Sequence, residues 1–240
     1  MKWWLLALLA LCGCSGSEDP NDSGTPDAGH PHPARLDACA RAATVGTMAA
    51  VIDDLDALPM PVDNACFAAS LRRPIQVVAT VSDFSAQPSP DGGNPRIFFM
   101  LPAIVISVVP EGDGKDLIEM GAWRTALRTL KGEIALPVTS PLPEDAPITR
   151  VAQSNHTSTC SLCHRDESPD TLVDGGYVSI AFRPNPGLEV KVPALQQLHQ
   201  QCTDAHDASP RCDSVPRDLR LRADRAGRVL SRRRALLPVT

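Results

Sequence analysis

The fold of this chain is decided by the stretch Arg96-Ile-Phe-Phe-Met-Leu-Pro-Ala-Ile-Val-Ile-Ser-Val-Val109, which is almost wholly apolar. Most of its residues are β-branched or aromatic, and Leu101-Pro102-Ala103 interrupts it. Apolar runs of this kind are typical of strands buried in a sheet, so the stretch predicts two adjacent strands. The segment 75–84 is also rich in β-branched residues and predicts a third strand. The turn-rich residues 88–95 separate it from the stretch 96–109.

Further elements are predicted on both sides of these strands. The segment 36–58 repeats apolar residues with a period of 3.6 and ends at Pro59, which predicts a helix. Other expected elements are a short helix at 63–71, strands at 117–123, 129–138 and 177–182, and a last helix at 192–204.

These elements predict the α+β class, as a mostly antiparallel β-sheet or small sandwich with an N-terminal helical hairpin and a C-terminal helix. A hydrophobic content of 43% is enough for a core. We expect a single domain over residues 36–212. It would be helical at 36–72 and β-rich at 73–140, with a cysteine-containing segment at 150–190 before the helix at 192–204.

Charge is unevenly distributed along the chain. The net charge is −5, but residues 211–240 hold nine Arg and three Asp, a net +6, which leaves −11 for residues 1–210. An acidic body argues against a nucleic-acid partner. Three interpretations of the Arg-rich tail at 213–240 stay open: a solvated tail, a basic surface that contacts a membrane, or the product of a shifted reading frame.

The chain begins with Met1-Lys-Trp-Trp-Leu-Leu-Ala-Leu-Leu-Ala-Leu-Cys-Gly-Cys14, a single positive charge followed by a short apolar run. The run is far shorter than the ~20 residues that span a bilayer, so it predicts a cleaved signal peptide over residues 1–13. The last four residues of the quoted stretch resemble the lipobox of bacterial lipoproteins. That resemblance implies lipid attached to Cys14 and, because Ser15 follows, an outer-membrane location in the bacterial cell envelope.

Residues 15–34 contain no aliphatic side chain larger than that of alanine, so the segment 14–35 predicts a disordered tether after the lipid-bearing cysteine. Lipid attachment would place the domain in an oxidising compartment, where cysteines are commonly paired. Six cysteines follow Cys14. Their proximity in sequence suggests the pairs Cys39/Cys66, Cys160/Cys163 and Cys202/Cys212 among fifteen connectivities.

One motif carries specific chemistry, Cys160-Ser-Leu-Cys163-His164. It resembles the C-x-x-C-H attachment motif of c-type cytochromes. That resemblance implies that both thiols bond to a haem and that His164 ligates its iron. No methionine follows His164, so His199 or His206 would supply a second ligand, unless the iron is five-coordinate.

The place of the motif, late in a β-rich domain and followed by the strand 177–182, is also similar to the β-sheet c-type cytochromes that oxidise hydroxylamine. Proteins of that family have a lysine bonded to their haem. By this resemblance, the lysine bonded to the haem would be Lys115 or Lys131.

Two other interpretations of the motif stay open. Cys160 and Cys163 could form a disulfide beside a polar His164, or the three residues could form a zinc site or a redox-active dithiol. We found no hydrolase, metalloprotease or phosphate-loop motif, and we predict no catalytic residue.

The sequence therefore predicts a membrane-anchored envelope lipoprotein that carries haem c for electron transfer or ligand sensing. Its partners would be the membrane, through the lipid on Cys14, and an unidentified redox partner or other envelope protein. The alternative is a non-catalytic binding lipoprotein that is stabilised by disulfides.

Overall fold

The computed structural model of this protein describes residues 34–207 and 209–212, which belong to one compact unit. The predicted signal peptide, Cys14, residues 14–33 of the predicted tether and the Arg-rich segment 213–240 lie outside the described residues. What the sequence predicts for those segments stays a prediction.

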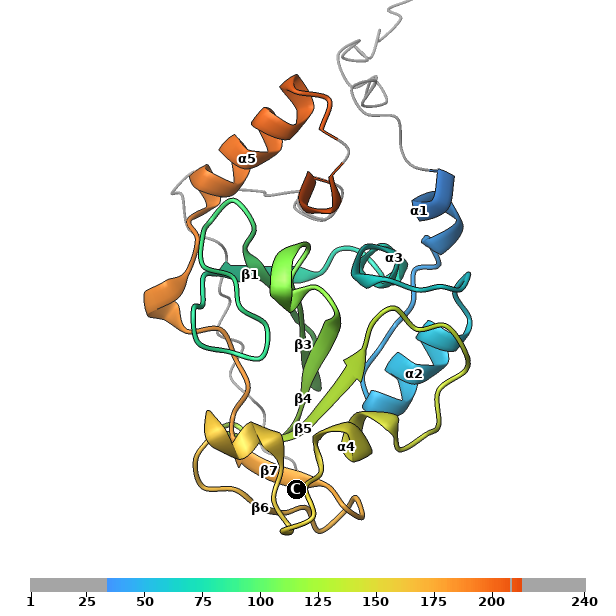
Figure 1. The fold of residues 1–240 in the computed structure, drawn as a ribbon, viewed down its shortest axis with the longest axis vertical. Coiled ribbons are helices and arrows are strands. Elements are labelled where there is room, and N and C mark those ends of the chain that lie inside the picture. Colours follow the sequence, from blue (N-terminus) through green and yellow to red (C-terminus); the bar gives the residue numbers. More distant parts are fainter. Residues whose placement is uncertain (1–33, 208, 213–240) are drawn as a thin grey trace, which may run out of the picture. The chain divides into compact units, whose positions relative to one another are not determined.

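One open antiparallel sheet of seven strands forms the centre of the fold, in the order β1-β2-β3-β4-β5-β7-β6 (Figure 1). The strands are β1 (Gln76–Thr80), β2 (Arg96–Met100), β3 (Ile104–Val108), β4 (Leu117–Thr125), β5 (Arg128–Ala135), β6 (Ser168–Pro169) and β7 (Tyr177–Ile180). All six predicted strands are present, and the short β6 is an addition. The predicted α+β class is confirmed, with a single sheet and not a sandwich.

The stretch 96–109 forms the hairpin β2–β3, as its composition predicts. Residues 101–103 make the turn, which the Leu101 N–H closes by donating to the Ile104 carbonyl over 3.1 Å. Nine of the ten residues in the two strands are buried, and the buried residues lie on both faces of the sheet. Burial on both faces explains why the sequence here is continuously apolar instead of alternating.

One face of the sheet packs against helices and forms the main hydrophobic core. Ile97, Phe99 and Ile106 lie on this face and are at most 3% exposed. Gly132 of β5 lies on the same face, and a Cβ atom there would come within 3.0 Å of the side chain of Met48 and 2.9 Å of that of Pro147. Helices α2 (Met48–Asp56) and α4 (Ala146–Val151) therefore lie close over β5, and Figure 1 shows both beside that strand.

The predicted helix over 36–58 is wrong in its continuity, because the structure has two helices there, α1 (Ala34–Cys39) and α2. Between them, the Ala43 N–H donates to the Ser70 carbonyl over 2.7 Å, and the Ala43 carbonyl accepts from the Arg72 N–H over 2.8 Å. This pairing replaces helical hydrogen bonds. The Thr47 hydroxyl then caps α2 by accepting from the Ala50 N–H over 3.1 Å.

The predicted second helix is α3 (Asn64–Ser70), which the Asp63 carboxylate caps by accepting from the Cys66 N–H over 2.9 Å. A disulfide joins Cys39 of α1 to Cys66 of α3, the pairing that proximity suggested. Both cysteines are at most 1% exposed. The predicted helical hairpin is therefore three short helices, pinned by a buried disulfide.

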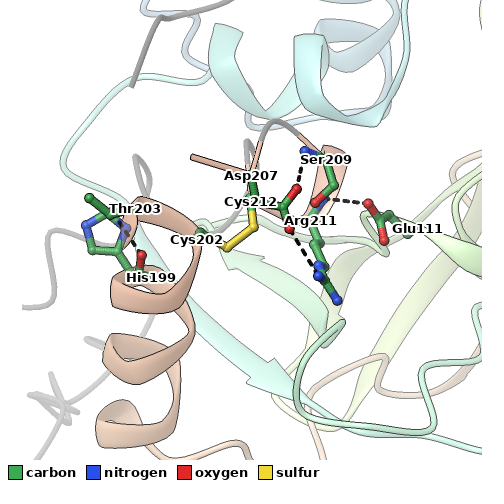
Figure 2. The surroundings of a disulfide bond; sticks show 8 residues. All are labelled: Glu111, His199, Cys202, Thr203, Asp207, Ser209, Arg211 and Cys212. Carbon is green, nitrogen blue, oxygen red and sulfur yellow. Dashed lines mark hydrogen bonds and ion pairs between the residues drawn. A yellow bond between two sulfur atoms is a disulfide. The ribbon is translucent and has the colours of Figure 1, made fainter. Parts of the chain in front are cut away.

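The C-terminal helix α5 (Val192–Asp204) has the predicted bounds. A second disulfide joins its Cys202 to Cys212, as expected (Figure 2). Figure 2 also shows Arg211 between two acidic residues: its guanidinium pairs with Asp207 at 3.1 Å, and its backbone N–H donates to the Glu111 carboxylate over 3.2 Å. These contacts hold Arg211 against the turn that precedes β4.

The remaining elements are three 3₁₀ turns, η1 (Gly112–Gly114), η2 (Thr159–Leu162) and η3 (Pro186–Leu188).

Within the described ranges, no helix is both long and apolar enough to cross a membrane. Two disulfides in one domain indicate an oxidising, extracytoplasmic compartment.

Candidate functional site

The sheet face opposite the main core carries charged side chains. Residues that pair across antiparallel strands share a face, and the register here runs from Phe98 to Ser107, from Ser107 to Glu119, and from Glu119 to Glu133. Lys131 lies on the same face, two residues before Glu133. We refer to the following residues as the polar face: Arg96, Ser107, Glu119, Lys131 and Glu133.

Arg96 uses all three nitrogens of its guanidinium within this face. One nitrogen pairs with the Glu119 carboxylate, and the other two donate to the hydroxyls of Ser107 at 3.1 Å and Ser85 at 3.0 Å. The guanidinium and the carboxylate are both nearly buried. Burial lowers the pKa of Arg96 and raises the pKa of Glu119, and the attraction between the two charges opposes both shifts.

Two aromatic rings cover the Arg96 guanidinium. Its central carbon lies 4.8 Å from the centre of the Phe98 ring and 5.2 Å from that of Phe182, in cation–π contact. Phe182 can approach the sheet because position 121 is a glycine, where a Cβ atom would come within 2.7 Å of the Phe182 Cβ. Its backbone N–H donates to the Thr129 hydroxyl over 2.9 Å.

Glu133 has no ion-pair partner among the residues that the structure describes. Among the described residues it makes no hydrogen bond or ion pair, since the guanidinium of Arg96 is committed to Glu119 and two serines. Burial and, next in size, the Glu119 charge raise the pKa of Glu133 to about 7, against smaller opposing effects of Arg150 and Arg96. A large fraction of this carboxyl group is therefore protonated at neutral pH.

The raised pKa of Glu133 predicts a pH-dependent effect on stability. The unfolded chain loses this proton near pH 4.5 and the folded chain near pH 7, so the group progressively destabilises the fold between these two values. We expect Glu133→Gln to raise the free energy of unfolding by about 1–2 kcal/mol at pH 8, with allowance for solvent screening, and to change it little at pH 4. Urea unfolding at both pH values measures this, and an equal effect at pH 4 and pH 8 would contradict it.

Lys131 is only 2% exposed, and neutral oxygens hold its ammonium group. Its Nζ donates to the Thr129 hydroxyl over 2.8 Å, the Thr129 carbonyl over 3.1 Å and the Ile180 carbonyl over 2.8 Å. Burial lowers the pKa of Lys131 to about 8, partly offset by the negative charge of the Glu167 carboxylate. The cation lies beside the C-x-x-C-H motif, because the Ile180 carbonyl that accepts from Lys131 also contacts the His164 ring.

The motif lies on η2, and hydrogen bonds of the Ser158 and Glu167 side chains hold the start of that turn. The Ser158 hydroxyl accepts from the Cys160 N–H over 3.2 Å and itself donates to the Glu167 carboxylate. That carboxylate also accepts from the Ser158 N–H over 2.8 Å. The Cys160 carbonyl then accepts from the backbone N–H groups of both Cys163 and His164. This pattern fixes the backbone from Ser158 to His164 as one compact turn.

Cys160 and Cys163 are free thiols in this structure, whereas the other four described cysteines form disulfides. Cys163 is exposed and Cys160 is half-buried. Burial, followed by the negative charge of Glu133, raises the pKa of Cys160 to about 12, so this group is a thiol and not a thiolate.

His164 is oriented by the strand that follows the motif. Its Nδ1 lies 3.1 Å from the Ile180 carbonyl of β7, and since a carbonyl only accepts, Nδ1 carries the proton. Nε2 is therefore left with a lone pair. Burial and, next, the positive charge of Lys131 lower the pKa of His164 to about 4, so the ring is neutral. Its centre lies 6.1 Å from that of Phe182.

The structure brings Cys160, Cys163, His164 and Lys131 together but leaves the other candidates elsewhere. His199 lies on α5, whose buried residues Leu198 and Cys202 belong to the main core, and no hydrogen bond or ring contact within the described ranges joins it to the motif. His206 is exposed just after α5, and Lys115 is exposed after η1. Arg96, Glu119 and Glu133 were not predicted from the sequence as site residues. A signal was present for two of them: Glu119 shares one face of a predicted strand with Gly121, and Glu133 shares one face of the next strand with Lys131.

The residues at the motif fit the attachment of a c-type haem. Such a group requires two thiols spaced by two residues and a neutral imidazole with one free nitrogen, and Cys160, Cys163 and His164 supply these. Two apolar side chains at the motif are exposed. Leu162, within the motif, is 82% exposed, and Leu127, whose carbonyl accepts from the Ala181 N–H, is 67% exposed. In the described ranges, no group of three or more His, Cys, Asp or Glu side chains is placed to hold a metal ion directly.

None of the protein-family models, curated proteins or solved structures compared with this chain matches it. The assignment of a function therefore rests on the residues of the site.

Proposed function

We propose that this protein is a lipid-anchored envelope protein that carries a covalent c-type haem on Cys160 and Cys163, with His164 as an iron ligand, and that it transfers electrons. The observation that carries the proposal is the state of the three motif side chains. Both thiols are free in a domain whose other described cysteines are paired, and the Ile180 carbonyl holds the imidazole in the tautomer with a free Nε2. A metal-ligating histidine characteristically donates its other ring N–H to such a partner.

The position of the motif favours electron transfer over buried chemistry. Cys163 and Leu162 are exposed, so the edge of a group bonded here would lie within reach of a partner protein. The chain's own residues hold the imidazole, shield one side of it with Phe182 and supply fixed charges below it. When bound, the haem would supply a one-electron couple. The lipid predicted on Cys14 would keep the domain near a membrane, and dual or triple acylation makes release negligible.

A single experiment tests both parts of this proposal. The full chain is produced in a bacterium that has cytochrome c maturation machinery, and membrane and soluble fractions are run on a denaturing gel and stained for haem. We expect a haem-positive band in the membrane fraction. Cys160→Ser/Cys163→Ser should remove the stain but not the membrane location, and Cys14→Ser should move a stained band to the soluble fraction.

The matched control is Cys202→Ser/Cys212→Ser, which removes two cysteines away from the motif and should keep the stain. An unstained wild-type chain at the same protein level would refute the haem. Mass spectrometry of that chain would then show whether Cys160 and Cys163 form a disulfide, the outcome that favours a binding lipoprotein.

A further inference from the structure

One backbone carbonyl connects the buried lysine to the motif histidine. The Ile180 carbonyl accepts from the Lys131 ammonium over 2.8 Å and from the His164 Nδ1–H over 3.1 Å. Both contacts lie in the part of the site where β5 and β7 pair, and the Ile180 N–H is bonded to the Arg165 carbonyl over 3.0 Å. The N–H of the same peptide group, that of Ala181, donates to the Leu127 carbonyl over 2.9 Å, so both ends of the peptide group that holds this oxygen are hydrogen-bonded.

A shared acceptor makes the two donors compete. The partner of the non-ligating nitrogen sets how much electron density a histidine offers to a metal, because a stronger acceptor gives the ring more anionic character. Lys131 is a charged donor and it is the closer of the two to the oxygen, so it withdraws electron density from the carbonyl that His164 depends on. The positive charge of Lys131 is shielded from water. It therefore also favours the reduced state of a group bound at the motif, because that state carries less positive charge.

We propose that Lys131 is a positioning residue that acts through the Ile180 carbonyl on His164, weakening the imidazole as an electron donor and raising the reduction potential of the group bound at the motif. This inference rests on the proposed function, since it concerns the haem that His164 would ligate. Lys131 itself would touch neither the iron nor a substrate. It differs from the covalent lysine link implied by the resemblance to hydroxylamine-oxidising cytochromes, because here the ammonium acts by hydrogen bonding and charge.

The test compares three substitutions in the haem-loaded full chain at pH 6.5. Lys131→Met removes both the donor and the charge, Lys131→Gln keeps a donor without the charge, and Lys131→Arg keeps both. We expect Lys131→Met to lower the midpoint potential by about 59 mV, a tenfold shift in the one-electron equilibrium. Lys131→Gln should fall between it and the wild type, and Lys131→Arg should stay near the wild type.

Haem content and the urea midpoint of each variant are measured first, so that a folding defect is recognised. If Lys131→Met does not fold, the ordering of Lys131→Gln below Lys131→Arg still decides the question. Equal potentials in folded, fully loaded Gln and Arg variants overturn the inference and leave the proposed function standing.

A second measurement keeps the inference testable if the chain takes up no haem, the result that refutes the proposed function. In the metal-free protein, the NMR signal of the proton on His164 Nδ1 reports the strength of its bond to Ile180. We expect this proton to move downfield in Lys131→Gln, because the histidine then has a weaker competitor for the carbonyl. An unchanged proton shift would show that the lysine does not act through this oxygen.

Discussion

Replacing both Cys39 and Cys66 by alanine is expected to lower the free energy of unfolding by about 3–4 kcal/mol. The disulfide closes a loop with a sequence separation of 27, and the loss of chain entropy in the unfolded state scales with the length of such a loop. The bond also ties α1 to α3 in a region where the first helix is only six residues long. Short helices have little stability of their own, so α1 depends on this link.

The second disulfide provides the comparison. Cys202 and Cys212 are separated by only 10 residues, so the same estimate gives about 2–3 kcal/mol for Cys202→Ala/Cys212→Ala. Urea unfolding of the wild type and both double variants, each with and without a thiol reductant, measures the two contributions. If the Cys39/Cys66 variant proved more stable than the Cys202/Cys212 variant, the entropic account of this pinning would be wrong.

The sheet was predictable because its strands are short, apolar and separated by clear turns. The hairpin β2–β3 follows from a continuous apolar run broken at Pro102, and α5 follows from its apolar spacing. The break between α1 and α2 was not predictable, because the apolar period runs through it. It depends on hydrogen bonds from Ala43 to the distant segment after α3, which a local pattern does not contain.

The motif was visible in the sequence, but the polar face beneath it was only partly so. Charged residues at alternate positions in two neighbouring strands indicate one shared face, and this would have joined Glu119 to Glu133. Their burial could not be predicted in the same way. It requires the segment from Ser158 to Phe182 to fold back over the sheet, and that depends on the close approach of Phe182 to Gly121.

In the haem-loaded protein that we propose, His164→Gly is expected to keep the covalent haem but to lose its nitrogen ligand, so that the absorption bands of the histidine-ligated iron disappear. The two thioether bonds proposed at Cys160 and Cys163 would not require the imidazole. The fold should tolerate the change, because the Ile180 carbonyl keeps Lys131 as a donor when the ring is gone. The loss is therefore specific to ligation, and free imidazole added to the variant should restore the wild-type bands by occupying the vacated space.

Imidazole rescue separates a ligand from a structural residue, since a histidine that only packs against Phe182 would give no recoverable spectrum. The matched control is His156→Gly, which removes an exposed ring at a position with φ 61°, where glycine is readily accepted. It should leave the spectrum unchanged. His199→Ala examines the second candidate ligand in the same assay, and because His199 lies on α5 with its neighbours in the main core, we expect it to match the wild type. A His164→Gly protein with an unaltered spectrum would mean that another side chain ligates the iron.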